Sequence, residues 1–402
     1  MNRPIVVFGA TALLIVAGAI AFRPSAQAGA PRLPKDDAEI LERVPTGSTD
    51  PRARREVELR RALAANPGDL ATALKLARLD IQQSRARSDP RYLGYAQAAL
   101  GRWWDDPAAP PEVLVLRATI RQSLHDFVGA LADLDAVIAR DPDDAQAWIT
   151  RSVVLTVRWR YDEALASCAP LERLSTPLVV AVCIGSVEAV TGHAERAYAR
   201  IDAALASAAR ATADEHAWAA STLGEIAIRL GRDADGEKQF LAALAVDPND
   251  GYVLGAYADL LLDTGRAPEA VRLLAGRTDN DGLLLRLALA EAKTGGPDAR
   301  AHADAIGARF DAAHLRGDRL HVREESRFEL GLRHDPARAL ELAIDDFAIQ
   351  REPWDVRVYV EAALAAHRPD EAKPVLDFLA EHHLEDPRIA AVAAQLRTGG
   401  AP

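Results

Sequence analysis

A small residue recurs about every 34 positions along this chain, and that period limits the folds open to it more than any other feature. The steps are 34, 34, 33, 39, 34, 33, 36 and 33 residues, and the series is Ala96, Ala130, Ala164, Ala197, Gly236, Ala270, Ala303, Ala339 and Ala372. Solenoids of helical hairpins repeat at this length, because one hairpin buries its apolar stripe only against its neighbours. The period predicts a stack of hairpins rather than one catalytic core.

The composition favours helices throughout. Ala and Leu dominate the apolar residues, aromatic residues make up 5%, and the chain has one Met. Ala and Leu have high helix propensities, and runs of β-branched residues are short. We therefore expect an all-α protein. The large excess of Arg over Lys suggests a GC-rich bacterial gene.

The charge argues against nucleic acid as a partner. The net charge is −11 and the pI is about 5.5, whereas binding to a polyanion needs a basic surface. One local exception precedes the first full repeat, and it consists of Arg52, Arg54, Arg55, Arg60 and Arg61. We interpret this cluster as a solvated helix face.

The N-terminus looks like an export segment. Arg3 precedes an apolar run from Ile5 to Phe22, and Ser25-Ala26-Gln27-Ala28 offers a cleavage site before Gly29. The run is also long enough to cross a bilayer. Residues 1–28 are therefore expected to be a signal peptide or an N-terminal membrane anchor. Both alternatives place the rest outside the cytoplasm, periplasmic or secreted, or anchored to the inner membrane and facing the periplasm.

The remaining chain divides by composition. Residues 29–53 hold several Pro residues among charges and are predicted to be a linker. Residues 54–397 carry the helical repeats, and residues 398–402 are expected to form a disordered tail. We expect membrane contact only through the N-terminal segment, and only if that segment is retained.

Two cysteines leave two interpretations open. Cys168 and Cys183 fall on consecutive predicted helices that pack together, so an oxidising compartment allows a disulfide between them. Two independent buried thiols are the alternative, which we slightly favour. The His or further Cys at ligand spacing that a metal site needs are absent from the sequence, and no metal or other cofactor is expected.

The clearest repeat spans residues 217–250. Leu223, Ile226 and Leu230 form one helical stripe, and Gly231 is placed to end that helix with a left-handed residue. Asp247-Pro248 then stops the second helix, because Pro cannot continue it. Two such helices need neighbours to cover their stripes.

This repeat resembles the tetratricopeptide repeat (TPR). Residues 217–250 match its pattern at Leu223, Gly224, Gly231, Phe240, Ala243 and Pro248. The resemblance extends from about residue 55 to 397 and is strongest in the centre. It implies a right-handed α-solenoid of about nine helical hairpins, a TPR-like superhelix with capping helices. Together with the N-terminal segment and the excess of Arg, it suggests an exported bacterial TPR protein.

The resemblance also implies that the first helix of each hairpin lines a concave groove. The residues one turn from each packing stripe are then candidates for binding a protein or peptide. They are Ile149, Val153, Val182, Ser186, Trp218, Ser221, Glu225, Tyr252 and Asp259. Trp218 and Tyr252 are of the kind enriched at binding hot spots, while Glu225 and Asp259 predict an acidic groove that suits Arg or Lys on the partner. Simple coverage of neighbouring helices is the alternative role for these side chains.

The sequence contains no recognised arrangement of catalytic residues. Paired acids such as Asp345-Asp346 are adjacent on a helix and do not converge on one substrate atom. We predict a non-enzymatic interaction scaffold of the cell envelope. The alternative is an accessory subunit that assembles or matures a membrane or metal enzyme complex. The partner's identity does not follow from the sequence.

Overall fold

The structure, a computed structural model, describes residues 51–398. The chain divides into two units, residues 1–53 and residues 54–402. The segments predicted as signal or anchor, most of the linker, and all of the tail but Thr398 lie outside the described residues. Within residues 51–398 the regular structure is helical and contains no strand. The predicted all-α repeat fold is confirmed.

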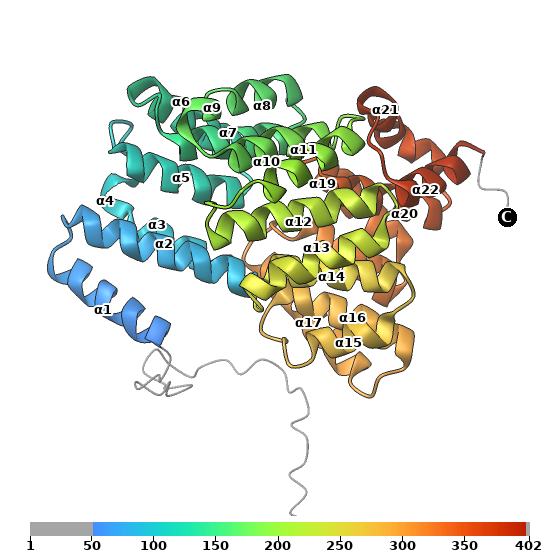
Figure 1. The fold of residues 1–402 in the computed structure, drawn as a ribbon. Helices are drawn as coiled ribbons and strands as arrows, with labels where there is room; N and C mark the ends of the chain where they lie inside the picture. Colours follow the sequence, from blue (N-terminus) through green and yellow to red (C-terminus); the bar gives the residue numbers. More distant parts are fainter. Residues whose placement is uncertain (1–50, 399–402) are drawn as a thin grey trace, which may run out of the picture. The chain divides into compact units, whose positions relative to one another are not determined.

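Over residues 70–382 of the described chain, nine hairpins follow one another in chain order (Figure 1). Their first helices are α2 (Leu70–Arg87), α5 (Pro111–Ser123), α7 (Ala145–Val157), α10 (Pro177–Glu188), α12 (Ala213–Arg229), α14 (Gly251–Asp263), α16 (Asp281–Thr294), α18 (Val322–Phe328) and α20 (Pro353–Ala365). Their second helices are α3 (Arg91–Ala99), α6 (Phe127–Arg140), α8 (Tyr161–Cys168), α11 (Ala194–Ala206), α13 (Asp233–Val246), α15 (Ala267–Leu274), α17 (Ala299–Leu315), α19 (Pro336–Phe347) and α21 (Lys373–His382).

Further helices flank or connect these pairs. Helix α1 (Pro51–Ala65) precedes the first hairpin and α22 (Pro387–Arg397) follows the last. Short helical turns occupy four connections, and they are α4 (Gly101–Trp104), α9 (Leu171–Leu174), the π-helical η1 (Glu329–Arg333) and the 3-10 turn η2 (Pro369–Ala372). Among residues 51–398, no helix combines the length and the apolar character needed to cross a bilayer.

Small residues allow the two helices of a hairpin to approach closely. A Cβ atom added at Gly224 would lie 2.6 Å from the ring of Phe240, and one added at Gly185 would lie 2.6 Å from Ile201. Phe240 and Ile201 are fully buried. These two small residues of the first helices are therefore a packing requirement, since a dense core has no room for the extra carbon. The same holds for Gly236 of the recurring series, where an added Cβ atom would lie 2.6 Å from Ile228.

The turns inside the hairpins need a left-handed residue. Gly231 has φ +72°, as predicted for the end of α12, and Gly192 and Gly265 have φ +75°. Only glycine adopts this conformation without a steric penalty. At the corresponding turns of other hairpins, His125 and Trp159 take positive φ values of 59° and 50°. The repeat therefore keeps the turn geometry where its sequence signal is lost.

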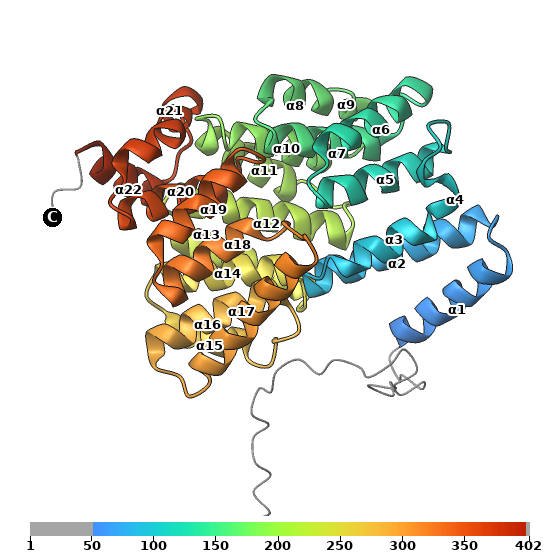
Figure 2. The same ribbon diagram turned by 180° about the vertical axis from the view of Figure 1, so that it is seen from behind.

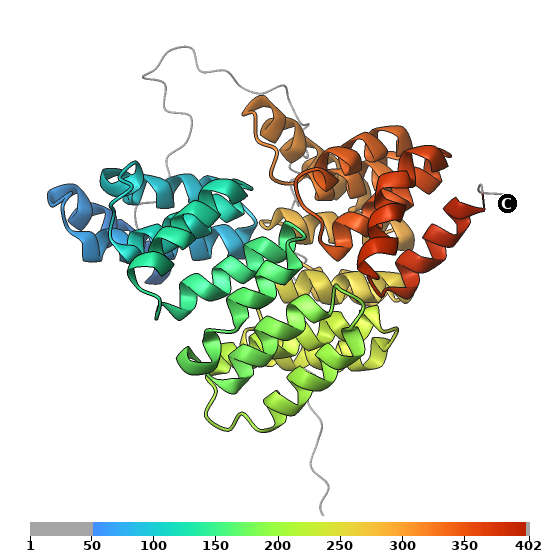
Figure 3. The same ribbon diagram turned by 90° about the horizontal axis from the view of Figure 1, so that it is seen from above.

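The C-terminal hairpins pack across the middle of the solenoid (Figures 2 and 3). Arg327 of α18 donates to Asp259 of α14 at 2.7 Å, and Arg357 of α20 donates to Asp263 at 2.6 Å. The amide N–H of Arg351 donates to the carbonyl of Val157 at 3.1 Å. These contacts join helices several repeats apart, so the solenoid closes on its own concave side.

Candidate functional site

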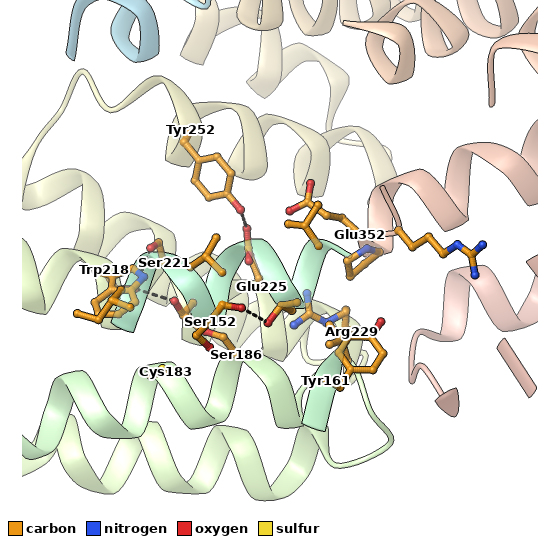
Figure 4. Close-up of a pocket in the computed structure, with 18 residues that line it drawn as sticks. Ser152, Tyr161, Cys183, Ser186, Trp218, Ser221, Glu225, Arg229, Tyr252 and Glu352 are labelled. Atoms are coloured by element: carbon orange, nitrogen blue, oxygen red, sulfur yellow. Dashed lines mark hydrogen bonds between the residues drawn. The ribbon is translucent and has the colours of Figure 1, made fainter. Parts of the chain in front are cut away.

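A cavity of about 270 Å³ lies on the concave side (Figure 4). Helices α7, α10 and α12, which are successive first helices, form its wall, and Tyr252 of α14 reaches in from the next hairpin. The connection from α19 to α20 closes the cavity with Arg351, Glu352 and Pro353. The same hairpin order that stacks the first helices therefore also builds the pocket.

Seven of the nine candidate groove residues line this cavity. They are Ile149, Val153, Ser186, Trp218, Ser221, Glu225 and Tyr252. Since they come from four helices, their convergence follows from the stacking of the hairpins rather than from one local motif.

The other two candidates do not reach the cavity, which corrects the predicted groove. Val182 is fully buried. Asp259 is 2% exposed and lies between Arg286 and Arg327, each of which donates to it at 2.7 Å. Burial alone would raise the pKa of Asp259, but the two guanidinium groups hold it below its usual value. Asp259 therefore adds no free negative charge to the groove.

Three of the hydroxyl groups in the wall bond to their own helices. Thr156 donates to the carbonyl of Ser152 at 2.8 Å, and Ser186 donates to that of Val182 at 2.8 Å. Thr222 donates to the carbonyl of Trp218 at 2.9 Å. Because each of these hydroxyls uses its one proton inside the helix, it offers a ligand only acceptor capacity. Together with the valine and isoleucine side chains, this makes the wall mainly apolar.

Glu225 and Tyr252 supply a polar group at the mouth of the cavity. The Tyr252 hydroxyl donates to Oε1 of Glu225, and Figure 4 shows the ring pointing toward that carboxyl group. Burial in the hollow raises the pKa of Glu225. Tyr252 donates the hydrogen bond to that carboxyl group, while 65% of its surface remains exposed to a ligand.

The closing connection is fixed at both ends. Arg158 of the α7 hairpin donates to the carbonyl of Ile349 at 2.5 Å, and the guanidinium of Arg351 lies 3.7 Å from the ring centre of Trp159. Arg323 donates to Glu352 at 3.1 Å and to Asp355 at 3.0 Å. The lid of the cavity is therefore held by hydrogen bonds and by a guanidinium stacked on an aromatic ring.

Some lining residues of the cavity were not predicted from the sequence, both in the wall and in the connection that closes it. Ser152 and Thr156 share the helical stripe of Ile149 and Val153, so helical spacing was a usable signal for them. Arg351, Glu352 and Pro353 offer no such signal, because they follow the wall residues by more than a hundred positions.

The two cysteines lie next to this cavity. The Sγ atoms of Cys168 and Cys183 are bonded, with their Cα atoms 5.8 Å apart. The bond joins α8 to α10, and Cys183 also contributes to the cavity wall. The structure thus has the disulfide alternative in place of the two separate thiols that we favoured from the sequence.

Two histidines of α17 pair with acids. Nδ1 of His302 lies 2.7 Å from Glu291, and Nε2 of His314 lies 2.9 Å from Glu325. Among the described residues, no group of three or more His, Cys, Asp or Glu is arranged to hold a metal ion. These contacts stabilise neighbouring helices.

Several solved structures resemble the chain. A thermophilic TPR protein of Thermus thermophilus is 23% identical, with 48% of this chain and 98% of that chain covered and a TM-score of 0.38. A tetratricopeptide repeat protein of Parabacteroides merdae is 14% identical, with 71% and 98% covered and a TM-score of 0.33. The human IFIT1 dimer with m7Gppp-AAAA is 11% identical, with 86% of each chain covered and a TM-score of 0.45.

No protein-family model matches the chain. No curated protein matches it either. The type of fold therefore rests on the helices themselves. Consecutive antiparallel hairpins, with a small residue at each crossing and a left-handed turn within each pair, make this a helical repeat protein of the TPR type.

Proposed function

We propose that this chain is a non-enzymatic scaffold of the cell envelope that binds a protein or peptide in its concave groove, at the cavity beside Trp218 and Tyr252. The observation that carries the proposal is the convergence of apolar and aromatic side chains from successive first helices on one open hollow. Ligand sites in proteins are typically concave, mostly apolar and furnished with a few polar groups, as this one is.

The size of the cavity limits the mode of binding. Because residues 351–353 cover part of the groove, the hollow suits one or two inserted side chains rather than a whole helix. Glu225 presents a carboxyl group beside the exposed Tyr252 ring, and this combination favours a partner side chain with an apolar stem and a donor at its tip. Arg229 and Arg351 in the same lining balance the charge, so the groove is less acidic than the sequence suggests.

Selection of peptides on the full chain tests this proposal. Phage-displayed random dodecapeptides are selected on the wild-type protein, and the affinity of the synthetic winners is measured by fluorescence anisotropy. Replacing Trp218→Ala together with Tyr252→Ala is expected to weaken binding by about tenfold or more, as loss of hot-spot aromatics does.

Tyr95→Ala is the matched control, since Tyr95 is an exposed tyrosine of α3 outside the cavity lining. Circular dichroism and the thermal midpoint show whether each variant is folded. Equal affinity of the wild type and the Trp218, Tyr252 variant for every selected peptide would exclude the cavity as the binding site.

The envelope location is supported by two observations. The sequence of residues 1–28 has the features of an export segment, and Cys168 is bonded to Cys183, as is common in oxidising compartments. Mass spectrometry of the mature protein tests the location and its form. A chain that begins at Gly29 indicates an exported protein, and retention of residues 1–28 indicates an anchor.

A retained anchor also favours the second candidate function, an accessory subunit for the maturation of a membrane or metal enzyme complex. The apolar run of 18 residues from Ile5 to Phe22 is the observation that supports it. In that case the groove partner co-purifies with the chain from detergent-solubilised membranes rather than from the soluble fraction.

A further inference from the structure

The positive charge of this acidic chain is concentrated at the start of the repeats. Between Arg54 and Trp104 there are ten Lys and Arg residues and five Asp and Glu residues, whereas the whole chain has 48 and 59. This segment contains α1 to α4, which form one end of the helical stack in Figure 1. The segment from α1 to α4 is therefore basic, although the whole protein has a net charge of −11.

The charges lie on the exposed sides of α1 and α2. Arg54, Val57 and Arg61 are spaced three and four residues apart on α1 and are all exposed. Lys75 and Arg78 are exposed on α2, whose one acidic residue, Asp80, is fully buried on another side of the helix. We call Arg54, Arg55, Arg61, Lys75 and Arg78 together the basic surface.

Nearby carboxylates neutralise little of this surface. Arg55 is the member of the basic surface that pairs with an acid, Glu58, at 3.6 Å. Asp80 and Glu56 both contact Arg60, at 3.3 and 2.7 Å, and Asp89 contacts Arg91 at 2.6 Å. Among the described residues, Arg54, Arg61, Lys75 and Arg78 have no carboxylate within 4.0 Å. The positive charges are thus left for an external anion.

Exposed apolar groups accompany the charges. Val57 on α1 and Tyr95 on α3 are each 46% exposed, and the guanidinium of Arg60 lies 4.7 Å from the ring centre of Tyr95. Basic side chains mixed with valine and tyrosine suit the interface of a bilayer, where cations meet headgroup phosphates and aromatic rings reach the acyl boundary. A nucleic-acid surface would favour the charges but not Val57.

We propose that the basic surface binds the anionic phospholipid headgroups of a membrane. The order of the chain supports this occupant, since the apolar run that ends at Phe22 lies only 32 positions before Arg54. If the apolar segment binds lipid, it holds α1 and α2 near the membrane and raises their effective concentration there. Binding of the basic surface does the same for the apolar segment, so the two interactions strengthen each other. The surface is distinct from the groove cavity and does not depend on the peptide proposal.

Co-sedimentation of the full chain with vesicles tests this proposal. Vesicles of phosphatidylcholine alone are compared with vesicles in which a third of the lipid is phosphatidylglycerol. Residues 1–28 contain Arg3 and Arg23, which also favour the anionic vesicles, so the basic surface is reported by the part of the ratio of the two partition coefficients that is lost when its residues are replaced. We expect a ratio of at least about tenfold for the wild type, decreasing with salt, because each surface-bound Lys or Arg contributes about fivefold.

The variant Arg54→Gln, Arg61→Gln, Lys75→Gln is expected to lower the ratio by at least about tenfold, because it removes three of the five charges of the basic surface. Its matched control is Arg210→Gln, Arg272→Gln, Arg397→Gln, which removes three exposed charges elsewhere and leaves the ratio unchanged. A wild-type ratio near one overturns the proposal, and so does an unchanged ratio in the first variant. Binding of a single-stranded oligonucleotide through the same three residues, without preference for anionic vesicles, would assign the surface to nucleic acid instead.

Discussion

At the scale of single residues, Gly224 shows why the repeat needs its small position. A methyl group there would lie 2.6 and 2.7 Å from two carbons of the Phe240 ring, which is fully buried and has no free space to move into. Gly224→Ala is therefore expected to destabilise the protein by about 1–3 kcal/mol, as overpacking does. Urea unfolding followed by circular dichroism measures the change.

Gly94 is the matched control for this prediction. It also lies inside a helix, α3, but a Cβ atom added there meets nothing within 4 Å. Gly94→Ala is expected to stabilise the protein by about 0.5–1 kcal/mol, because alanine loses less backbone entropy in a helix. If both substitutions shift stability in the same direction, close helix approach is not what selects the small residue at position 224.

Residue patterns predicted much of the fold because the same short-range sequence features occur in most of the repeats. The small residue at each crossing and a glycine such as Gly231 at the turn recur often enough to give the number of hairpins and their approximate positions. Where the turn residue is His125 or Trp159, the spacing alone carried the prediction. Such patterns can be recognised in a single sequence, since they involve residues that are close together in the chain.

At the scale of elements, the position of the connection between α19 and α20 could not be predicted from the sequence, because it depends on contacts between residues far apart in the chain. Its position over the cavity depends on Arg351 reaching Val157 and on Arg158 reaching Ile349, pairs separated by about 190 positions. The same limit explains Asp259, whose spacing placed it in the groove while Arg327 of a distant helix surrounds it. Long-range docking of one stack on another leaves no periodic trace in a single sequence.

That connection also carries a buried acid pair. Asp346 of α19 is 3% exposed and Asp355 of α20 is 1% exposed, and Gln350 donates to both, at 3.4 and 3.2 Å. Burial and the adjacent Asp355 raise the pKa of Asp346 well above its usual value. The folded protein therefore holds a proton that the unfolded chain releases near pH 4.

This proton makes stability depend on pH. A carboxyl group with a raised pKa in the folded state contributes fully below the pKa of the unfolded chain, and the contribution is lost as the pH rises. Asp346→Asn keeps the shape and removes the titration. It is expected to raise the free energy of unfolding at pH 8 by about 1 kcal/mol or more and to flatten its decrease between pH 5 and 8.

Urea unfolding across this pH range measures the effect. Asp345→Asn is the control, because Asp345 is exposed and pairs with Arg319 at the surface, where ion pairs contribute little. A slope as steep in the Asp346→Asn protein as in the wild type would mean that Asp346 does not hold a proton in the folded state.

At the scale of the whole repeat unit, Asp263 links the C-terminal hairpins to the middle ones. Its carboxylate accepts from both Nη atoms of Arg357, at 2.6 and 2.7 Å, and Arg388 of α22 lies 3.3 Å away. One side chain of α14 thus holds two C-terminal helices. The same docking places residues 351–353 over the cavity. Asp263 is not a lining residue, so we expect it to influence the position of this cover indirectly, through the docked helices.

Asp263→Asn is expected to loosen this docking while each hairpin stays folded. Losing the charge weakens hydrogen bonds to two guanidinium groups and costs about 1–2 kcal/mol. Hydrogen exchange followed by mass spectrometry should show faster exchange in α20 and α22 and unchanged exchange in α5 and α6, since opening is local. Asp202→Asn is the control, because Asp202 is exposed and forms no ion pair among the described residues, and it should alter neither region. Uniformly faster exchange along residues 54–398 would instead show that the hairpins unfold as one cooperative unit. Residues 351–353 would then not move away from the groove independently of the other hairpins.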